Sequence, residues 1–281
     1  MKLTVLLDNN TLIDHYFLGE PGVSYLLQEG DTTVLFDVGY SDAFIRNAQK
    51  MPEVDLLAVD VLVLSHGHMD HTWGLLPLAQ LYSEAMFEGR SFERPALVAH
   101  PAVFQSRTLG DLGEIGSIIS AERLTGHFDV RFSREPVWLT ERLVFLGEIE
   151  RTNDFEAQSP IGTVVTGQQE EEDDYLLDDT ALAYRSSQGL VIVTGCSHAG
   201  ICNIVEQAKR VCGEERVVDV LGGFHLLDPS EEQLQGTLDY MRTLQPAEVH
   251  ACHCTDLASK IALAGVANLK ELGVGMVFEY D

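Results

Sequence analysis

The stretch that decides the fold reads Val61-Leu62-Val63-Leu64-Ser65-His66-Gly67-His68-Met69-Asp70-His71. Its first part is an unbroken run of valine and leucine, which is typical of a buried strand. Its second part follows at once and carries imidazoles and a carboxylate, the side chains that bind zinc, iron or manganese in proteins. We therefore predict a strand that ends in a metal-binding loop.

The spacing within this loop indicates how the side chains are shared between ions. Side chains two residues apart in extended backbone point to the same side, so His66 and His68 should converge. Gly67 between them allows a tight turn, because it carries no side chain. Asp70 and His71 lie at the turn into the next helix and are predicted to face a second ion. Such an open site keeps a position for a water molecule.

One loop cannot complete two coordination spheres, so further ligands must come from later strand ends. Three apolar runs, at 190–193, 217–221 and 248–251, lead into loops that contain His198, His225 and His253. The first predicted metal ion is bound by His66, His68 and His198. The second is bound by Asp70, His71 and His253. For His225, metal binding and substrate binding both remain open, and we predict His225 and Asp70 as the catalytic residues.

Composition limits the partners of this chain. Its 281 residues carry 18 Lys+Arg against 44 Asp+Glu, a net charge of -26. Such a surface repels phosphate backbones, so we predict no nucleic-acid partner, whereas bound divalent ions would still attract a small anionic substrate. No signal peptide and no long apolar span is evident, so no membrane partner is predicted. The 5 cysteines form no C-x-x-C pair, which favours the reducing cytoplasm. The pattern does not indicate an oligomeric state.

Strand-like and helix-like segments alternate in both halves of the chain, which predicts two sheets packed face to face with helices outside. Strands are predicted at 3–7, 23–28, 32–36, 61–64, 96–99, 143–146, 181–184, 190–193, 217–221 and 248–251. Helices are predicted at 41–50, 74–84, 201–211, 231–243 and 257–264, the fourth with Ser230 as its N-cap. Residues 88–160, with scattered glycines and charges, are predicted to be an insertion over the core. The acidic run 168–174 is predicted to be an exposed loop.

The motif His66-x-His68-x-Asp70-His71, preceded by Leu35-Phe36-Asp37-Val38-Gly39, resembles the signature of the metallo-β-lactamase superfamily. The resemblance implies an α/β fold, the αββα sandwich in which two mixed sheets lie face to face with helices outside. It implies that this single domain spans residues 1–281. It also implies that Asp37 supports the metal-binding histidines from outside the ligand set.

A narrower resemblance is carried by several further segments. They are Asp8-Asn9-Asn10, Gly147-Glu148-Ile149, Asp178-Asp179-x-Ala181-Leu182, Thr194-Gly195-Cys196-Ser197-His198-Ala199-Gly200-Ile201, Gly222-Gly223-Phe224-His225-Leu226 and His253-Cys254-Thr255. They are similar to the branch that includes an archaeal synthase of methanopterin biosynthesis. The chain departs from the superfamily pattern at Cys196, where an aspartate commonly bridges the metals. We predict His198 as a ligand and Cys196 as its close neighbour outside the ligand set; the alternative, a coordinated thiolate, would favour zinc.

Three functions are compatible with these residues. The first is a metal-dependent hydrolase that acts on a small phosphate- or ester-bearing molecule through a metal-activated water. Its cofactors would be two divalent ions, zinc first, with iron and manganese as alternatives. The branch resemblance implies a second, a transferase that joins an arylamine ribosyl phosphate to a pterin diphosphate. The third is a non-catalytic metal-binding or redox-sensing module, since Cys196 and Cys254 lie beside the predicted site.

Overall fold

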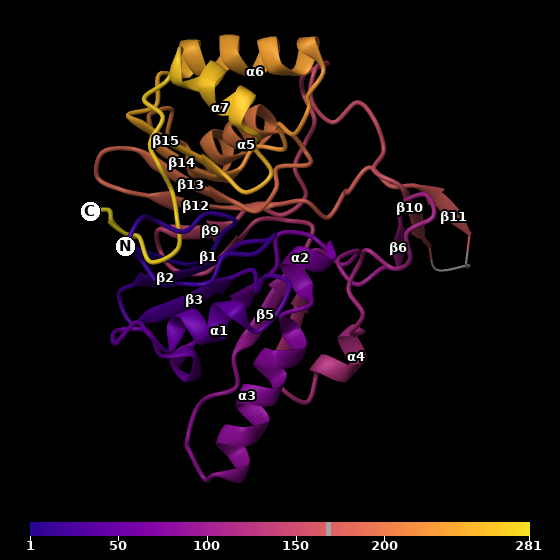
Figure 1. Cartoon of the computed structure of the whole chain (residues 1–281), viewed down its shortest axis with the longest axis vertical. Coiled ribbons are helices and arrows are strands. Elements are labelled where there is room, and N and C mark those ends of the chain that lie inside the picture. Colours follow the sequence, from indigo (N-terminus) through magenta and orange to yellow (C-terminus); the bar gives the residue numbers. More distant parts are fainter. Residues whose placement is uncertain (167–169) are drawn as a thin grey trace.

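The computed structural model describes residues 1–166 and 170–281, and in it two mixed sheets lie face to face (Figure 1). In spatial order the first sheet consists of β16 (Val277–Glu279), β1 (Lys2–Leu7), β2 (Ser24–Glu29), β3 (Thr32–Phe36), β4 (Val61–Val63), β5 (Ala96–Ala99) and β7 (Asp129–Phe132). The second consists of β15 (Glu248–Cys252), β14 (Val217–Gly223), β13 (Leu190–Thr194), β12 (Ala181–Arg185), β9 (Leu143–Phe145) and β8 (Val137–Trp138). Every predicted strand is present, and the predicted αββα sandwich is confirmed.

Helices cover the two outer faces of the sandwich (Figure 1). On the first sheet lie α1 (Ala43–Ala48), α2 (Met69–Thr72), α3 (Leu75–Phe87) and the short α4 (Ala121–Leu124), with a 3-10 turn at Leu56–Ala58. On the second lie α5 (Ile201–Cys212), α6 (Glu231–Leu244) and α7 (Leu257–Ala264). The predicted cap is confirmed, because the Ser230 hydroxyl accepts a hydrogen bond of 3.1 Å from the backbone N–H of Gln233. Among the described helices, none has the length and apolar character needed to cross a membrane.

The central strands are buried on both faces, which explains their unbroken apolar runs. In β3, Val34 and Phe36 pack into the core between the sheets, while Leu35 packs toward the helices. In β13, Val191 and Val193 face the same inner core. Alternate side chains of one strand therefore join two different hydrophobic layers.

The expectation that 88–160 is an insertion is wrong for much of its length. Within it, β5 and β7 extend the first sheet, and β8 and β9 extend the second. A separate small sheet of β6 (Arg107–Thr108), β10 (Thr163–Val165) and β11 (Glu171–Asp173) projects from the sandwich (Figure 1). The strands that the sequence did not predict here, β6, β7, β8, β10 and β11, have two to four residues each, and such short segments show little periodicity.

The acidic run 168–174 was expected to be an exposed loop. Glu171–Asp173 instead form strand β11, with all three residues exposed. Gln168 and Gln169 lie outside the described residues. Exposure was therefore predicted correctly for this acidic strand, but its backbone conformation was not.

Candidate metal centre

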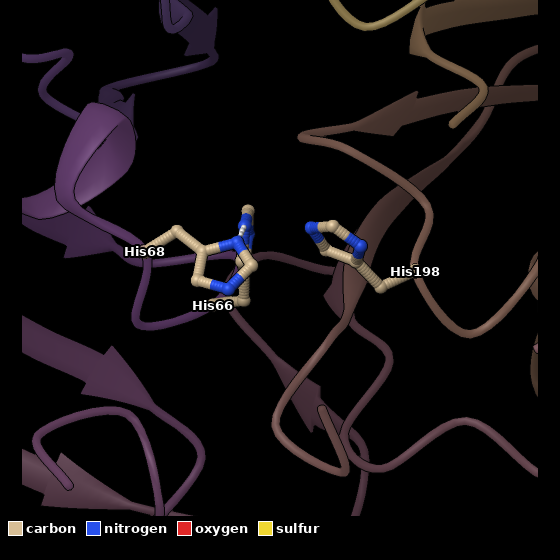
Figure 2. Close-up of side chains that lie close together, drawn as sticks. All are labelled: His66, His68 and His198. Atoms are coloured by element: carbon tan, nitrogen blue, oxygen red, sulfur yellow. Dashed lines mark hydrogen bonds between the residues drawn. The ribbon is translucent and has the colours of Figure 1, made fainter. Parts of the chain in front are cut away.

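The candidate ligands gather at one edge of the sandwich, where strands of both sheets end. His66 and His68 follow β4 of the first sheet, whereas His198 follows β13 of the second. Figure 2 shows these three rings turned toward one another from opposite sides. The ring centroids of His66 and His68 lie 4.8 Å apart, and those of His66 and His198 lie 4.7 Å apart. The two sheets thus contribute to one cluster.

Two groups of potential ligand atoms match the predicted division. His66, His68 and His198 form one group, and Asp70, His71 and His253 form another, with the atoms of each group within 4.8 Å of one another. In the second group, Asp70 Oδ2 lies 3.7 Å from His71 Nε2 and 3.4 Å from His253 Nε2. The ring centroids of His66 and His71 are only 4.2 Å apart, so the two groups adjoin.

Several ring nitrogens in the first group are buried without a protein partner. In the described part of the chain, nothing hydrogen-bonds to His68 Nε2 or to either ring nitrogen of His198. Burial lowers the pKa of His68 to about 3 and also holds the pKa of His198 well below its usual value. These imidazoles are therefore neutral and offer lone pairs, as metal binding requires. A buried polar group without a partner costs about 1–3 kcal/mol, so these residues fit a divalent metal ion.

Asp37 holds two of the histidines in place, as the resemblance implies. Its Oδ2 lies 2.7 Å from His71 Nδ1 and accepts a hydrogen bond of 2.6 Å from the Ser65 hydroxyl. The Ser65 hydroxyl in turn lies 2.9 Å from His66 Nδ1. These contacts leave Nε2 of both rings directed at the centre. Burial opposes protonation of His71, but the Asp70 and Asp37 carboxylates raise its pKa to about 9, so metal binding there must displace a proton.

Three supporting residues were not predicted. Ser65 is one, and Asn9 is another, since its Oδ1 lies 2.9 Å from His253 Nδ1 and fixes that ring. Asn9 belongs to the Asp8-Asn9-Asn10 run, so the sequence did contain a signal for it. The third is Arg107, which covers Gly67 so closely that a Cβ atom there would lie 1.9 Å from its Nη1. Nothing in the sequence distinguishes Arg107 from a surface arginine.

The loops that carry these side chains have unusual backbone geometry. Asp37, Ser197, His225 and His253 have φ angles of 56°, 62°, 49° and 47°, in the left-handed region that residues other than glycine rarely adopt. Each follows the end of a strand. Such strain persists only where the surrounding structure enforces it, and it concentrates at functional sites.

Cys196 lies between the two groups. Its Sγ is 3.2 Å from His71 Nε2 and 3.1 Å from His253 Nε2. Its Sγ also lies within 4.8 Å of a ring nitrogen of His66 in one group and of the Cys254 Sγ in another. The sequence favoured a neighbour outside the ligand set, whereas the position of this sulfur favours the alternative, a coordinated thiolate.

The remaining histidines lie around or away from the centre. The ring centroid of His225 is 4.3 Å from that of His198, and its buried Nδ1 has no partner among the described residues. His225 joins none of the ligand groups found in the described chain, which favours its reading as a substrate-contacting residue. His100 lies away from this cluster; it is buried and its Nε2 lies 3.1 Å from Glu148 Oε2.

Comparison with known proteins places this geometry in a family. The model of the metallo-beta-lactamase superfamily matches residues 18–253. The chain belongs to the metallo-β-lactamase superfamily. A relative from Methanocaldococcus jannaschii, 7,8-dihydropterin-6-methyl-4-(beta-D-ribofuranosyl)-aminobenzene-5'-phosphate synthase, is 27% identical over 269 residues, which cover 91% of this chain and 87% of the relative.

Solved structures of the metallo-β-lactamase superfamily agree. The crystal structure of Tm1679, a metal-dependent hydrolase of the β-lactamase superfamily, superposes with a TM-score of 0.83 at 26% identity and covers 100% of both chains. The metallo-β-lactamase fold protein YhfI from Bacillus subtilis has a TM-score of 0.61 at 13% identity, over 99% of this chain and 98% of that one. YhfI therefore shares the fold with this chain.

We expect Cys196→Ser and His198→Ala each to lower the metal content by about one ion per chain, because both side chains lie among the candidate ligand atoms. Cobalt-loaded wild type should show a sulfur-to-cobalt charge-transfer band in the near ultraviolet. That band should vanish in Cys196→Ser and persist in His198→Ala. Metal analysis and absorption spectra measure both effects, and Cys212→Ser, a buried cysteine of α5, is the control. A cobalt spectrum unchanged by Cys196→Ser would show that this thiol only packs beside the centre.

Proposed function

We propose that this chain is a metal-dependent hydrolase that cleaves a small phosphate- or ester-bearing molecule with a metal-activated water. The observation that carries the proposal is the cluster of buried imidazoles beside the Asp70 carboxylate, in which His68 and His198 are neutral and have ring nitrogens without a partner among the described residues. His66, His68 and His198 would hold one divalent ion, and Asp70, His71 and His253 the other. When bound, two divalent ions, zinc first and iron or manganese as alternatives, would polarise the scissile group and lower the pKa of water.

Asp70 and His225 have distinct roles in this proposal. Burial by itself would raise the pKa of Asp70. The neighbouring His71 and His253 outweigh burial and lower the pKa below its usual value, so the carboxylate is ionised near neutral pH. Its side chain is 22% exposed, and from this position it can orient an attacking water or accept its proton. His225 stands beside His198 with a free, buried Nδ1, which suits a hydrogen bond to the substrate.

The charge of the chain supports a small-molecule substrate. A net charge of -26 opposes the approach of a polynucleotide, whereas one ionised group can be neutralised at a dinuclear metal site. We therefore propose a small substrate and neither a nucleic acid nor a membrane as partner. The free cysteines support placement in the cytoplasm.

A second candidate is transfer rather than hydrolysis. It is favoured by the relative whose name describes a synthase of a pterin-linked aminobenzene ribofuranosyl phosphate, 27% identical to this chain. In that reaction an arylamine ribosyl phosphate would displace diphosphate from a pterin. Joint consumption of both substrates distinguishes transfer from hydrolysis, which consumes one substrate and water.

The test combines metal analysis with a substrate panel. Protein purified without chelator is expected to hold two divalent ions per chain and to hydrolyse at least one phosphate or carboxylate ester. Activity should disappear on chelation and return when zinc is added, because the reaction needs the ions to activate water. Loss of pterin diphosphate and arylamine in equal amounts, without ester hydrolysis, would establish the transferase. Stable metal binding with neither reaction would establish a binding or redox-sensing module.

A further inference from the structure

A cavity of about 370 Å³ opens beside His68 and Asp70. Its remaining walls are almost entirely apolar. They are formed mainly by Pro21, Tyr40, Leu109, Leu112, Ile115 and Ile161. The volume lies in the range of small-molecule sites. Among the described residues, the ionisable groups that line the cavity are the Tyr40 phenol and side chains of the candidate metal centre.

The outer wall of this cavity is attached directly to the metal-binding loop. The backbone N–H of Met69 donates a hydrogen bond of 2.8 Å to the carbonyl of Ile115. The indole N–H of Trp73 donates one of 2.8 Å to the carbonyl of Gly116, and Trp73 stacks on Tyr40 with ring centroids 5.1 Å apart. These contacts fix the position of the wall relative to His68 and Asp70.

The chemistry of the lining selects for an apolar occupant. None of the described residues that line this cavity is a lysine or arginine, so an anionic group would have to be neutralised at the metal edge. Leu109 and Leu112 remain 42% and 60% exposed at the mouth, where an apolar group would remove them from water. A phosphate or sugar hydroxyl that lies in the cavity away from the metal centre would face Leu109 and Leu112, which offer it no hydrogen bond.

We infer that this cavity holds an aromatic body of the substrate, whose scissile ester or phosphate group reaches the metal centre. The inference rests on the proposed function and names its substrate class. The substrate is an aryl ester or aryl phosphate, and sugar phosphates and nucleotides are excluded by the lining. Leu109 and Leu112 contact the apolar body and determine specificity.

Binding of three probes to zinc-loaded protein tests this inference without requiring turnover. The probes are 1-naphthyl phosphonate, methylphosphonate and 1-naphthol, measured by calorimetry. The naphthyl phosphonate should bind at least about tenfold more tightly than methylphosphonate, because only its ring enters the cavity. Leu112→Asp should remove that difference while metal content stays unchanged. Phe87→Asp, a matched change at a 93% exposed residue at the end of α3, should leave it intact.

Each outcome is decisive. Equal binding of both phosphonates to the wild type would overturn the cavity assignment and leave the proposed metal chemistry standing. Binding of naphthol and naphthyl phosphonate with equal affinity, both weakened by Leu112→Asp, would support the cavity and contradict phosphate recognition at the metals. No binding of any probe would overturn both.

Discussion

A His66→Ala variant is expected to lose most of its bound metal and its activity while its fold survives. The His66 side chain belongs to two candidate ligand groups, one with His68 and His198 and a further one with His71 and Cys196. Mutation of a residue that only hydrogen-bonds to a metal ligand already costs about 10–100-fold in metal affinity or activity. Removal of a ligand itself should therefore cost more. Metal analysis and initial rates measure both losses.

The fold should persist because His66 is not part of the hydrophobic core. That core includes Val5, Phe36 and Val193, which belong to a buried layer that both sheets supply. Circular dichroism of the metal-free wild type and the metal-free variant gives the comparison, since bound metal would itself stabilise the folded state. His15→Ala, at an exposed histidine, serves as control. A His66→Ala protein with full metal content and full turnover would contradict the assignment of the centre.

The largest effect on stability is expected at Arg107. This guanidinium is buried, and its Nε and Nη2 lie 2.8 Å from Asp174 Oδ2 and 2.7 Å from Asp178 Oδ1. Arg107→Ala would leave two buried carboxylates without their cation, a change that costs about 3–5 kcal/mol. Asp178 also accepts a hydrogen bond of 2.8 Å from the backbone N–H of Gly67, so metal affinity should fall as well.

Urea unfolding of metal-free protein measures the effect of Arg107→Ala. The matched control is Arg131→Ala, because Arg131 pairs with Asp129 on the surface, with side chains 67% and 57% exposed. An exposed pair contributes no more than about 1 kcal/mol, so this control should unfold near the wild-type midpoint. Equal shifts of the two midpoints would show that the buried arginine contributes no more than a surface one.

The strands, and the meeting of the candidate ligands at one edge, could be predicted because each depends on local sequence. An apolar run followed by a histidine marks a strand end, and in such a sandwich strand ends meet at one edge. His198 could therefore be grouped with His66 and His68 although it lies in a distant segment. Short strands such as β6 and β16 were missed, since two or three residues show no period.

Two features of the site could not be predicted from the sequence, because they depend on how distant segments are placed relative to one another. The place of the Cys196 sulfur between His71 and His253 follows from how the ends of β4, β13 and β15 align. The packing of Arg107 over Gly67 depends on the path of the segment between β5 and β7. Both are contacts between distant segments, and no local pattern records them.

The origin of the ligands on opposite sheets has a consequence for how the protein matures. His66 and His68 belong to the first sheet, whereas His198 and His253 belong to the second. During synthesis, the loop with His66 and His68 emerges from the ribosome before the segments with His198 and His253. At that stage the chain carries only part of the candidate ligand set. The complete set arises only when the two layers dock. Ions bound as proposed would then link the two sheets at this edge, and without them the link would be missing.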